Sequence, residues 1–303
     1  MKKCRETFCG FIAILGAPNV GKSTLLNRII GVKVSIVSSK VQTTRTRVLG
    51  IAIEDNSQLI FIDTPGIFLP KHRLDRAMVS AAWGGARDAD QIILLIDSKR
   101  GVDRNTELII NKLKENDSIN INLVLNKIDL INKQDLLKLT KKLNNYHIFQ
   151  DTFMVSAENG DGVTDLVTNL KSKIPASPWL FPEDQISDMP IRLLAAEITR
   201  EKLFEKLHQE LPYATTVDTE AWDNKDDGSL RIEQTIYVER ESQRSIVLGK
   251  NGKMIKSIGM ESRRELTDII DTKVHLFLFV KVREKWADEP SHYSRWGLDF
   301  NAR

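Results

Sequence analysis

Short apolar runs alternate with helical patterns along the first 175 residues of the chain. Apolar runs bounded by turn residues are typical of buried strands, and apolar positions that recur every three or four residues are typical of helices. The predicted strands cover residues 11–15, 48–53, 59–62, 92–96, 121–125 and 153–155, and the predicted helices cover 24–30, 74–86, 105–113, 136–143 and 163–174. This alternation predicts an α/β domain whose mostly parallel sheet has helices on both faces.

The pattern changes after residue 175. Prolines at 175, 178, 182 and 190 interrupt both periodicities, so residues 176–190 are predicted to form a linker on the surface. The elements beyond it are a helix at 191–211, strands at 214–222 and 230–239 joined by a turn at 223–229, helices at 243–248 and 253–270, and a strand at 274–282. This α-β-β-α-α-β order predicts an α+β second domain over residues 191–303, after a first domain of residues 1–175.

A glycine-rich segment joins the first predicted strand to the first predicted helix. It reads Gly16-Ala17-Pro18-Asn19-Val20-Gly21-Lys22-Ser23, the G-x-x-x-x-G-K-S pattern of phosphate-binding loops, and Thr24 follows it. The glycines allow the backbone N–H groups to converge on phosphate oxygens at the positive end of the helix. Lys22 would reach the β- and γ-phosphates, and the Ser23 hydroxyl would bind Mg²⁺. A plain glycine turn is the alternative, and the strand–loop–helix context favours the phosphate site.

A second motif, Asp63-Thr64-Pro65-Gly66, directly follows the strand predicted at 59–62. The carboxyl ends of parallel strands meet at one edge of a sheet, so Asp63 is expected near the phosphate loop, where a carboxylate can hold Mg²⁺ through water. The Gly66 N–H would bond a γ-phosphate when the loop closes, so nucleotide state would move the residues that follow. Alone, this segment fits a Pro-Gly turn equally well.

The third motif, Asn126-Lys127-Ile128-Asp129, follows the strand predicted at 121–125. A carboxylate at Asp129 can accept two hydrogen bonds from the N1–H and 2-amino groups of guanine, and adenine has no such pair of donors. Asn126 would brace the pocket, and the stem of Lys127 would lie over the base. Ser156-Ala157, after the last strand, would place a backbone N–H near the guanine O6. A polar loop that opens a helix is the alternative.

The second domain contains a G-x-x-G loop between two predicted helices, Gly249-Lys250-Asn251-Gly252. Such a loop lets a nucleic-acid backbone approach closely, while about four exposed bases are read in the adjacent groove. Apolar side chains at 246, 247, 254, 255 and 258 are expected to line the floor of that groove. Residues 240–264 carry a net charge of +5, and Lys250, Lys253 and Lys256 fit phosphate contacts. A helix–turn–helix connection with a solvated basic face is the alternative.

Together these motifs resemble those of the Ras-like GTPases related to translation factors. Asn19 and the stretch Gln42-Thr43-Thr44-Arg45 resemble the Era/TrmE branch specifically. The resemblance implies that residues 33–46 and 67–76 are switch segments and that Thr44 contacts Mg²⁺ in the GTP state. The residues it implies for GTP hydrolysis to GDP are Lys22, Thr44 and Gly66, and those for Mg²⁺ are Ser23, Thr44 and Asp63.

The residue after Asp63-Thr64-Pro65-Gly66 departs from the Ras pattern. Where Ras-like enzymes have a glutamine that positions water, this chain has Ile67, which cannot form a hydrogen bond through its side chain. In some relatives the P-loop asparagine helps to hold a K⁺ ion, so the resemblance makes Asn19 a candidate for that role. We expect slow intrinsic hydrolysis that a partner accelerates.

The second domain resembles a type II K-homology (KH) domain. Its pairing with the GTPase domain covers nearly the whole chain and implies membership of the Era family. That resemblance implies binding near the 3′ end of small-subunit (16S-type) ribosomal RNA, and a role in processing that RNA and in assembling the pre-small-subunit ribosome. Composition alone does not point to this target.

Charge and composition set broad bounds. The formal net charge is only +3, so the case for a nucleic-acid partner rests on the local basic patch. Cys4 and Cys9 form no disulfide framework, which favours a reduced, cytoplasmic setting. No apolar run approaches the length of a membrane span, and peripheral contact with the inner face of the cell membrane is an alternative for the basic patch. We expect a monomer.

Two other classes of function stay open on the sequence. The chain could be an ATP-dependent P-loop enzyme with an accessory fold, which the guanine-type Asn126–Asp129 motif disfavours. It could also be a structural RNA-binding module whose nucleotide site is not catalytic. Competition by ATP distinguishes the first from a GTPase, and turnover measured with ribosomal RNA present distinguishes the second.

Overall fold

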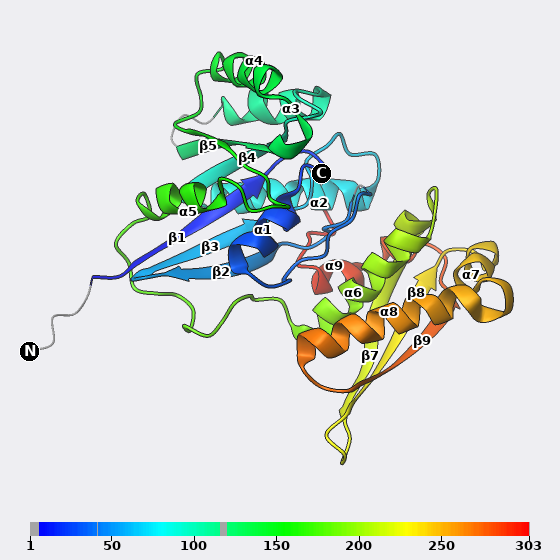
Figure 1. Cartoon of the computed structure of the whole chain (residues 1–303). Helices are drawn as coiled ribbons and strands as arrows, with labels where there is room; N and C mark the ends of the chain where they lie inside the picture. The colour runs from blue at the N-terminus through cyan, green and yellow to red at the C-terminus, as the bar shows by residue number, and fades with distance from the viewer. Residues whose placement is uncertain (1–5, 41, 116–119, 303) are drawn as a thin grey trace, which may run out of the picture. The chain divides into compact units, whose positions relative to one another are not determined.

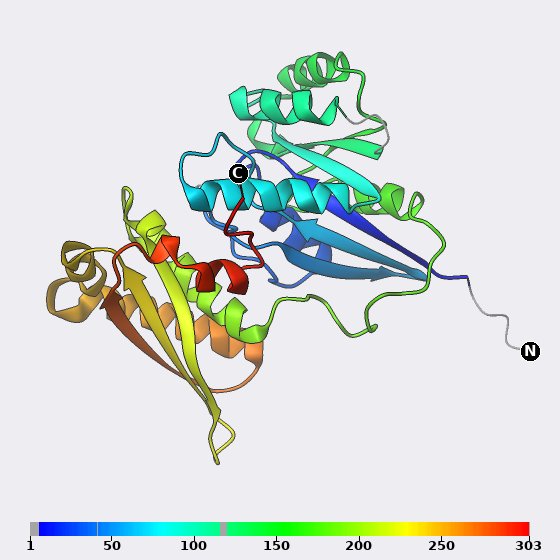
Figure 2. The same ribbon diagram turned by 180° about the vertical axis from the view of Figure 1, so that it is seen from behind.

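The computed structural model describes residues 6–40, 42–115 and 120–302 of the chain. Cys4 and Val41, the latter within the predicted switch segment 33–46, lie outside the described residues. The chain divides into two compact units (Figures 1 and 2). The first unit comprises the chain up to Asp188 and again from Tyr293 onward, and the second comprises Met189–His292. Each is described by itself below.

The first unit is built on a six-stranded sheet with the strand order β2-β3-β1-β4-β5-β6. Its strands are β1 (Phe8–Leu15), β2 (Val48–Glu54), β3 (Ser57–Asp63), β4 (Gln91–Asp97), β5 (Asn120–Asn126) and β6 (Thr152–Met154). Only the hairpin partners β2 and β3 run antiparallel; the other neighbours are parallel. The predicted mostly parallel sheet is thus confirmed, with the turn between residues 53 and 58 as expected.

Helices cover both faces of this sheet (Figure 1). The helices on one face are α1 (Lys22–Ile30) and α5 (Val163–Lys171), and those on the other are α2 (Arg73–Arg87), α3 (Arg104–Leu113) and α4 (Lys133–Asn144). Alternate residues of β1 show the division, because Ile12 and Ile14 pack with the first set while Ala13 and Leu15 pack with the second. Burial on both faces explains why the strands read as continuous apolar runs.

The second unit follows the predicted α-β-β-α-α-β order. Its elements are α6 (Ile191–Lys206), β7 (Thr215–Asn224), β8 (Leu230–Val238), α7 (Glu241–Leu248), α8 (Lys253–Ile270), β9 (Val274–Val282) and the short α9 (Pro290–Arg295). The sheet order is β7-β8-β9, with β9 parallel to β8. Helix α6 ends at Lys206 instead of at 211 because Leu207 takes an extended conformation and Gln209 a left-handed one.

The expected linker is held along the first unit. The N–H of Ser177 donates to the Thr7 carbonyl at 3.0 Å, and that of Ile51 donates to the Ile186 carbonyl at 2.9 Å. The end of the chain also belongs to this unit, where Arg73 lies 4.4 Å from the ring centroid of Phe300. The sequence predicts residues 176–190 as a separate linker and the tail as part of the second domain. Long-range backbone and ring contacts, which periodicity does not encode, instead attach residues 176–188 and the chain from Tyr293 to the first unit.

Candidate functional site

The phosphate-binding pattern forms the turn between β1 and α1. Gly21 caps α1 with a left-handed φ of 98°. A Cβ at this position would lie 2.4 Å from Nδ2 of Asn126, so only glycine fits both the conformation and the space. The turn therefore brings the loop directly against the motif that follows β5.

Lys22 lies buried at the start of α1. Its Nζ donates to the carbonyl oxygens of Gly16 at 3.3 Å and Ala17 at 3.1 Å. Burial lowers the pKa of Lys22 to about 8, against the opposing attraction of Asp63. A cation held in this way costs desolvation energy that a bound phosphate would offset.

Three hydroxyl groups gather around the Asp63 carboxylate at the end of β3. Oδ2 of Asp63 accepts from Ser23 Oγ at 2.7 Å and from Ser35 Oγ at 2.9 Å, and Ser23 Oγ lies 3.0 Å from Thr44 Oγ1. Oδ1 of Asp63 is buried and has no hydrogen-bond partner among the described residues. Burial raises the pKa of Asp63, although Lys22 and these hydroxyls oppose the shift. Hard oxygen ligands with one unused carboxylate oxygen fit Mg²⁺.

The rest of the Asp63–Gly66 motif is fixed to the phosphate loop. Thr64 Oγ1 donates to the Ile14 carbonyl at 2.8 Å. A Cβ on Gly66 would lie 2.9 Å from Pro18, so these two segments touch. Ile67 is 4% exposed and packs into the core with residues of β1 and β4. Its side chain is therefore part of the core and positions no water.

The guanine-type motif is cross-linked to the two neighbouring loops. Asn126 accepts from the Ala157 N–H at 2.9 Å through Oδ1 and donates to the Val20 carbonyl at 2.8 Å through Nδ2. Ser156 Oγ donates to Asp129 Oδ1 at 2.6 Å. Asn126 thus ties the phosphate loop to the Ser156-Ala157 segment, and Asp129 is held at one oxygen by that segment.

Lys127 bridges the same loops from its left-handed backbone position, with φ 62°. Its Nζ donates to the Asn19 carbonyl at 2.8 Å and to Asp97 Oδ2 at 2.8 Å. These contacts hold the lysine stem across the edge where β4 and β5 end, next to Asp129. The predicted nucleotide residues from 16–24, 63–67, 126–129 and 156–157 therefore converge on one edge of the sheet.

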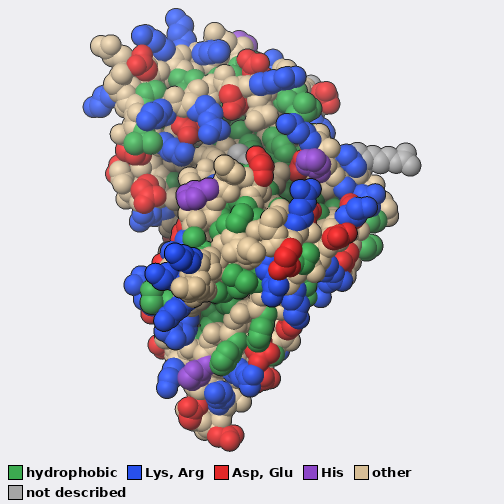
Figure 3. All heavy atoms as spheres, turned by 90° about the vertical axis from the view of Figure 1, so that its right-hand side faces the viewer, with side chains coloured by type: hydrophobic (Ala, Val, Ile, Leu, Met, Phe, Trp, Pro, Cys, Tyr) green, Lys and Arg blue, Asp and Glu red, His purple; other side chains and the backbone are tan. Residues whose placement is uncertain are grey.

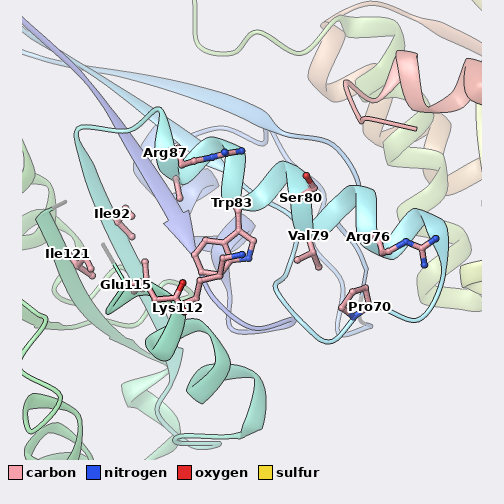
Figure 4. A pocket seen from close by; sticks show the side chains of 12 residues that line it. Pro70, Arg76, Val79, Ser80, Trp83, Arg87, Ile92, Lys112, Glu115 and Ile121 are labelled. Atoms are coloured by element: carbon pink, nitrogen blue, oxygen red, sulfur yellow. The ribbon is translucent and has the colours of Figure 1, made fainter. Parts of the chain in front are cut away.

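A cavity of about 360 Å³ opens at this edge. Its lining includes Pro18, Asn19, Gly21, Lys22, Ser23, Thr24, residues 36–39, Gln42, Thr43, Thr44, Gly66, Arg100 and Lys127. A larger cavity of about 540 Å³ lies between α2 and α3, with Val79, Trp83 and Ile121 in its wall (Figure 4). The two share no lining residue, and the larger one contains no motif residue, so chemistry and not size identifies the candidate site.

The G-x-x-G loop of the second unit makes a tight turn between α7 and α8. Gly249, Asn251 and Gly252 all have left-handed φ values, of 69°, 54° and 71°. A Cβ on Gly249 would lie 2.6 Å from Cβ of Met254, whereas one on Gly252 would meet nothing within 4 Å. Gly249 is thus needed for packing, and Gly252 keeps open space at the start of α8.

A groove of about 370 Å³ runs beside this loop between α8 and β9. Its lining residues are Ile255, Lys256, Gly259, Met260, Arg263, Leu276 and Leu278. Lysines 250, 253 and 256 are exposed, and Figure 3 shows basic and hydrophobic side chains together on the second unit. An apolar groove with a cationic rim suits bases inside and phosphates outside. Val247 and Ile258, expected in the floor, are instead buried in the core.

Family models match both units. The model described as a 50S ribosome-binding GTPase matches residues 11–127, and the model described as a KH domain matches residues 210–287. GTPase Era of Sinorhizobium medicae is 58% identical over 294 residues, which cover 97% of this chain and 94% of the relative. GTPase Era of Bradyrhizobium diazoefficiens is also 58% identical, with 97% and 95% covered. The chain belongs to the Era family of GTPases.

Solved Era structures share the whole architecture of this Era-family chain. A crystal structure of Era in complex with MgGDPNP and nucleotides 1506–1542 of 16S ribosomal RNA matches with a TM-score of 0.92 at 38% identity. The match covers 96% of this chain and 99% of the chain in that complex. An Aquifex aeolicus Era variant bound to GDP and AlF₄⁻ matches with a TM-score of 0.91, at the same identity and coverage. The chain is thus a GTP-hydrolysing P-loop GTPase with an RNA-binding KH domain.

Three residues of this Era-family site were missed by sequence reasoning: Ser35, Asp97 and Arg100. Ser35 donates to Asp63, and Arg100 lines the nucleotide cavity. Asp97 ends β4 and accepts from Lys127 and from the N–H groups of residues 99 and 100. Burial would raise the pKa of Asp97, but these hydrogen bonds lower it overall. Of these three residues, Asp97 alone had a signal in the sequence, because it stands at the end of an apolar run, where ligand groups of a parallel sheet gather.

Proposed function

We propose that this Era-family GTPase is a nucleotide-controlled assembly factor that binds small-subunit ribosomal RNA near its 3′ end. One observation carries the proposal: a single chain combines a guanine-type loop at Asp129 with a G-x-x-G groove at Gly249–Gly252. The relative solved with MgGDPNP and 16S ribosomal RNA supports the same pair of ligands. The role in processing that RNA, and in maturation of the pre-small-subunit ribosome, follows from this choice of target.

In the proposed hydrolysis, Ser23, Thr44 and Asp63 would hold Mg²⁺. Water attacks the γ-phosphorus, the bond to the bridging oxygen breaks, and GDP and phosphate leave. When bound there, Mg²⁺ would supply positive charge beside the phosphates. Lys22 and the loop N–H groups stabilise the negative charge that develops on the transferred group and on the leaving oxygen. Gly66 and Thr44 are the switch residues whose contacts depend on the γ-phosphate.

We propose that K⁺ assists this step at Asn19. The Asn19 Nδ2 donates to the Ser39 carbonyl at 2.7 Å, which joins the phosphate loop to the switch segment 33–46. Amide and carbonyl oxygens at such a junction suit an oxygen-binding cation. Turnover measured in potassium and in sodium salts tests the idea: wild type should be faster in K⁺, and Asn19→Ala should respond equally to both. An unchanged K⁺ response in the variant would reject Asn19 as a ligand.

The test of the overall function is crosslinking to 16S ribosomal RNA in the presence of a GTP analogue, GDP or no nucleotide. Gly252→Asp places a carboxylate where the RNA backbone would approach, so crosslinks should fall by about tenfold or more. Gly228→Asp is the matched control, because Gly228 has φ 76° and is equally open. It lies in the β7–β8 turn of the same unit, away from the groove.

Several outcomes would redirect this proposal. Crosslinks that do not depend on nucleotide, together with no turnover in the presence of RNA, would favour a structural RNA-binding module. Competition by ATP as strong as by GTP would favour an ATP-dependent enzyme.

Within the described residues no helix is both long and apolar enough to cross a membrane. We expect a monomer acting in the cytoplasm, and sedimentation with anionic vesicles would instead support peripheral contact with the inner face of the cell membrane.

A further inference from the structure

Three successive carbonyl groups of the phosphate-binding loop accept hydrogen bonds from side chains of other loops. Two of the donors are Asn126 and Lys127 of the guanine-type motif, as described above. The third is Arg100, whose Nη1 lies 3.1 Å from the carbonyl oxygen of Pro18. Arg100 belongs to none of the nucleotide motifs, yet it makes the same kind of contact as the two motif residues.

The orientation of the Pro18 carbonyl fixes the orientation of the next N–H group. A trans peptide is planar, so its C=O and N–H point in opposite directions. The Pro18 carbonyl is held toward Arg100, and the Asn19 N–H of the same peptide therefore faces away from Arg100. In a phosphate-binding loop that direction is toward the phosphates. Pro18 itself has no N–H, so the Asn19 N–H is the first donor after Ala17 in this part of the loop.

Arg100 is held in place by its own loop after β4. The Arg100 N–H donates to Asp97 Oδ1 at 3.1 Å, and Nη1 lies 3.8 Å from Asp103 Oδ2. The other oxygen of Asp97 binds Lys127. Asp97 therefore sets the positions of two cations, Lys127 and Arg100, on the same side of the phosphate loop. The side chain of Arg100 stays 42% exposed and lines the nucleotide cavity.

Hydrolysis in this chain has a particular need for such a contact. Ile67 is buried in the core, so no side chain at that position orients water or supports the transferring group. Catalysis then depends more heavily on backbone N–H groups and cations that are already positioned when charge develops. We propose that Arg100 is a positioning residue for GTP hydrolysis, which holds the Pro18–Asn19 peptide in the orientation that stabilises the transition state. The proposal rests on the GTPase activity and not on the identity of the RNA.

The test compares Arg100→Gln with Arg104→Gln in the full chain. Arg104 is exposed at the start of α3 and carries the same charge, so it controls for the general field around the cavity. Arg100→Gln should slow single-turnover hydrolysis of GTP by about tenfold or more, while the affinity for GDP changes by less than about threefold. Affinity for GDP with AlF₄⁻ should fall in parallel with the rate, and Arg100→Lys should restore part of both.

The outcomes separate this role from a structural one. Equal losses of affinity for GDP and for GDP with AlF₄⁻ would mean that Arg100 only supports nucleotide binding, and would overturn the proposal. A rate for Arg100→Gln that matches wild type, or one that Arg104→Gln reproduces, would overturn it as well. Unchanged GDP affinity verifies that the variant is folded. RNA crosslinking by Arg100→Gln with a GTP analogue should match that of wild type. A failure of the Arg100 proposal would therefore leave the proposed RNA-binding function intact.

Discussion

The two candidate binding regions are built in opposite ways. The nucleotide site joins six loop segments through short hydrogen bonds, and its central charges, Lys22 and Asp63, are buried. The groove proposed for RNA lies between one helix, α8, and one strand, β9, and its cations are exposed. A nucleotide has a fixed shape, which a preorganised and desolvated cradle can match. A flexible RNA strand is better met by an open groove whose charges stay in water.

The sharpest test of the preorganised cradle is Asp129→Asn. An amide at 129 loses one of the two acceptors that guanine requires and gains a donor that xanthine can use, so GTP affinity should fall by about a hundredfold or more. Xanthosine triphosphate should bind to this variant more tightly than to wild type. Isothermal calorimetry with both nucleotides measures the switch. Asp161→Asn, at an exposed position nearby, should leave both affinities as they are.

The open groove should respond to charge gradually. Replacing Lys250, Lys253 and Lys256 together by glutamine should weaken single-stranded RNA binding at moderate salt, and should reduce the slope of log affinity against log salt by about 2. Filter binding over a range of salt concentrations measures the slope. The same triple replacement at Lys225, Lys273 and Lys285 serves as control. If both triples change the slope equally, the lysines at the G-x-x-G loop have no special role.

A smaller effect concerns the proton on Lys22. Its pKa of about 8 in the nucleotide-free protein lies below the ordinary value near 10.5, so the lysine loses its proton as the pH rises through 8. A bound phosphate favours the charged form, hence nucleotide binding near pH 8.5 should take up a proton, and GDP affinity should weaken several-fold between about pH 7.5 and 8.5. Calorimetry in buffers of different ionisation enthalpy counts that proton. Lys22→Met should abolish the uptake, and uptake unchanged by this substitution would assign the proton to another group.

The same pKa links pH to the stability of the nucleotide-free protein. The unfolded chain binds more protons at Lys22 than the folded one between pH 8 and the unfolded pKa near 10.5. Burial of the charged lysine therefore lowers the free energy of unfolding below pH 8, and this loss of stability is relieved as the pH rises from 8 toward 10.5.

Sequence patterns located most of the fold because the two periodicities are local. Helix α8 and strand β9 end where the pattern predicts. The placement of residues 176–188 along the first unit depends on contacts with distant parts of the chain, such as the hydrogen bond between Ile51 and Ile186. Contacts of this kind leave no periodic signal in either partner.

The loop chemistry of this protein follows from its amino-acid sequence alone. Glycines, one lysine and one carboxylate at fixed spacing specify backbone conformations and donor types, and these are local properties. The other groups that complete the sites are brought together by folding: Arg100 on the Pro18 carbonyl, Ser35 on Asp63, and Leu276 and Leu278 of β9 in the groove. Folding also places Ile67 in the core. Each of these depends on which strand ends and helix faces meet, and the packing of the sheet settles that over distances that no local pattern spans.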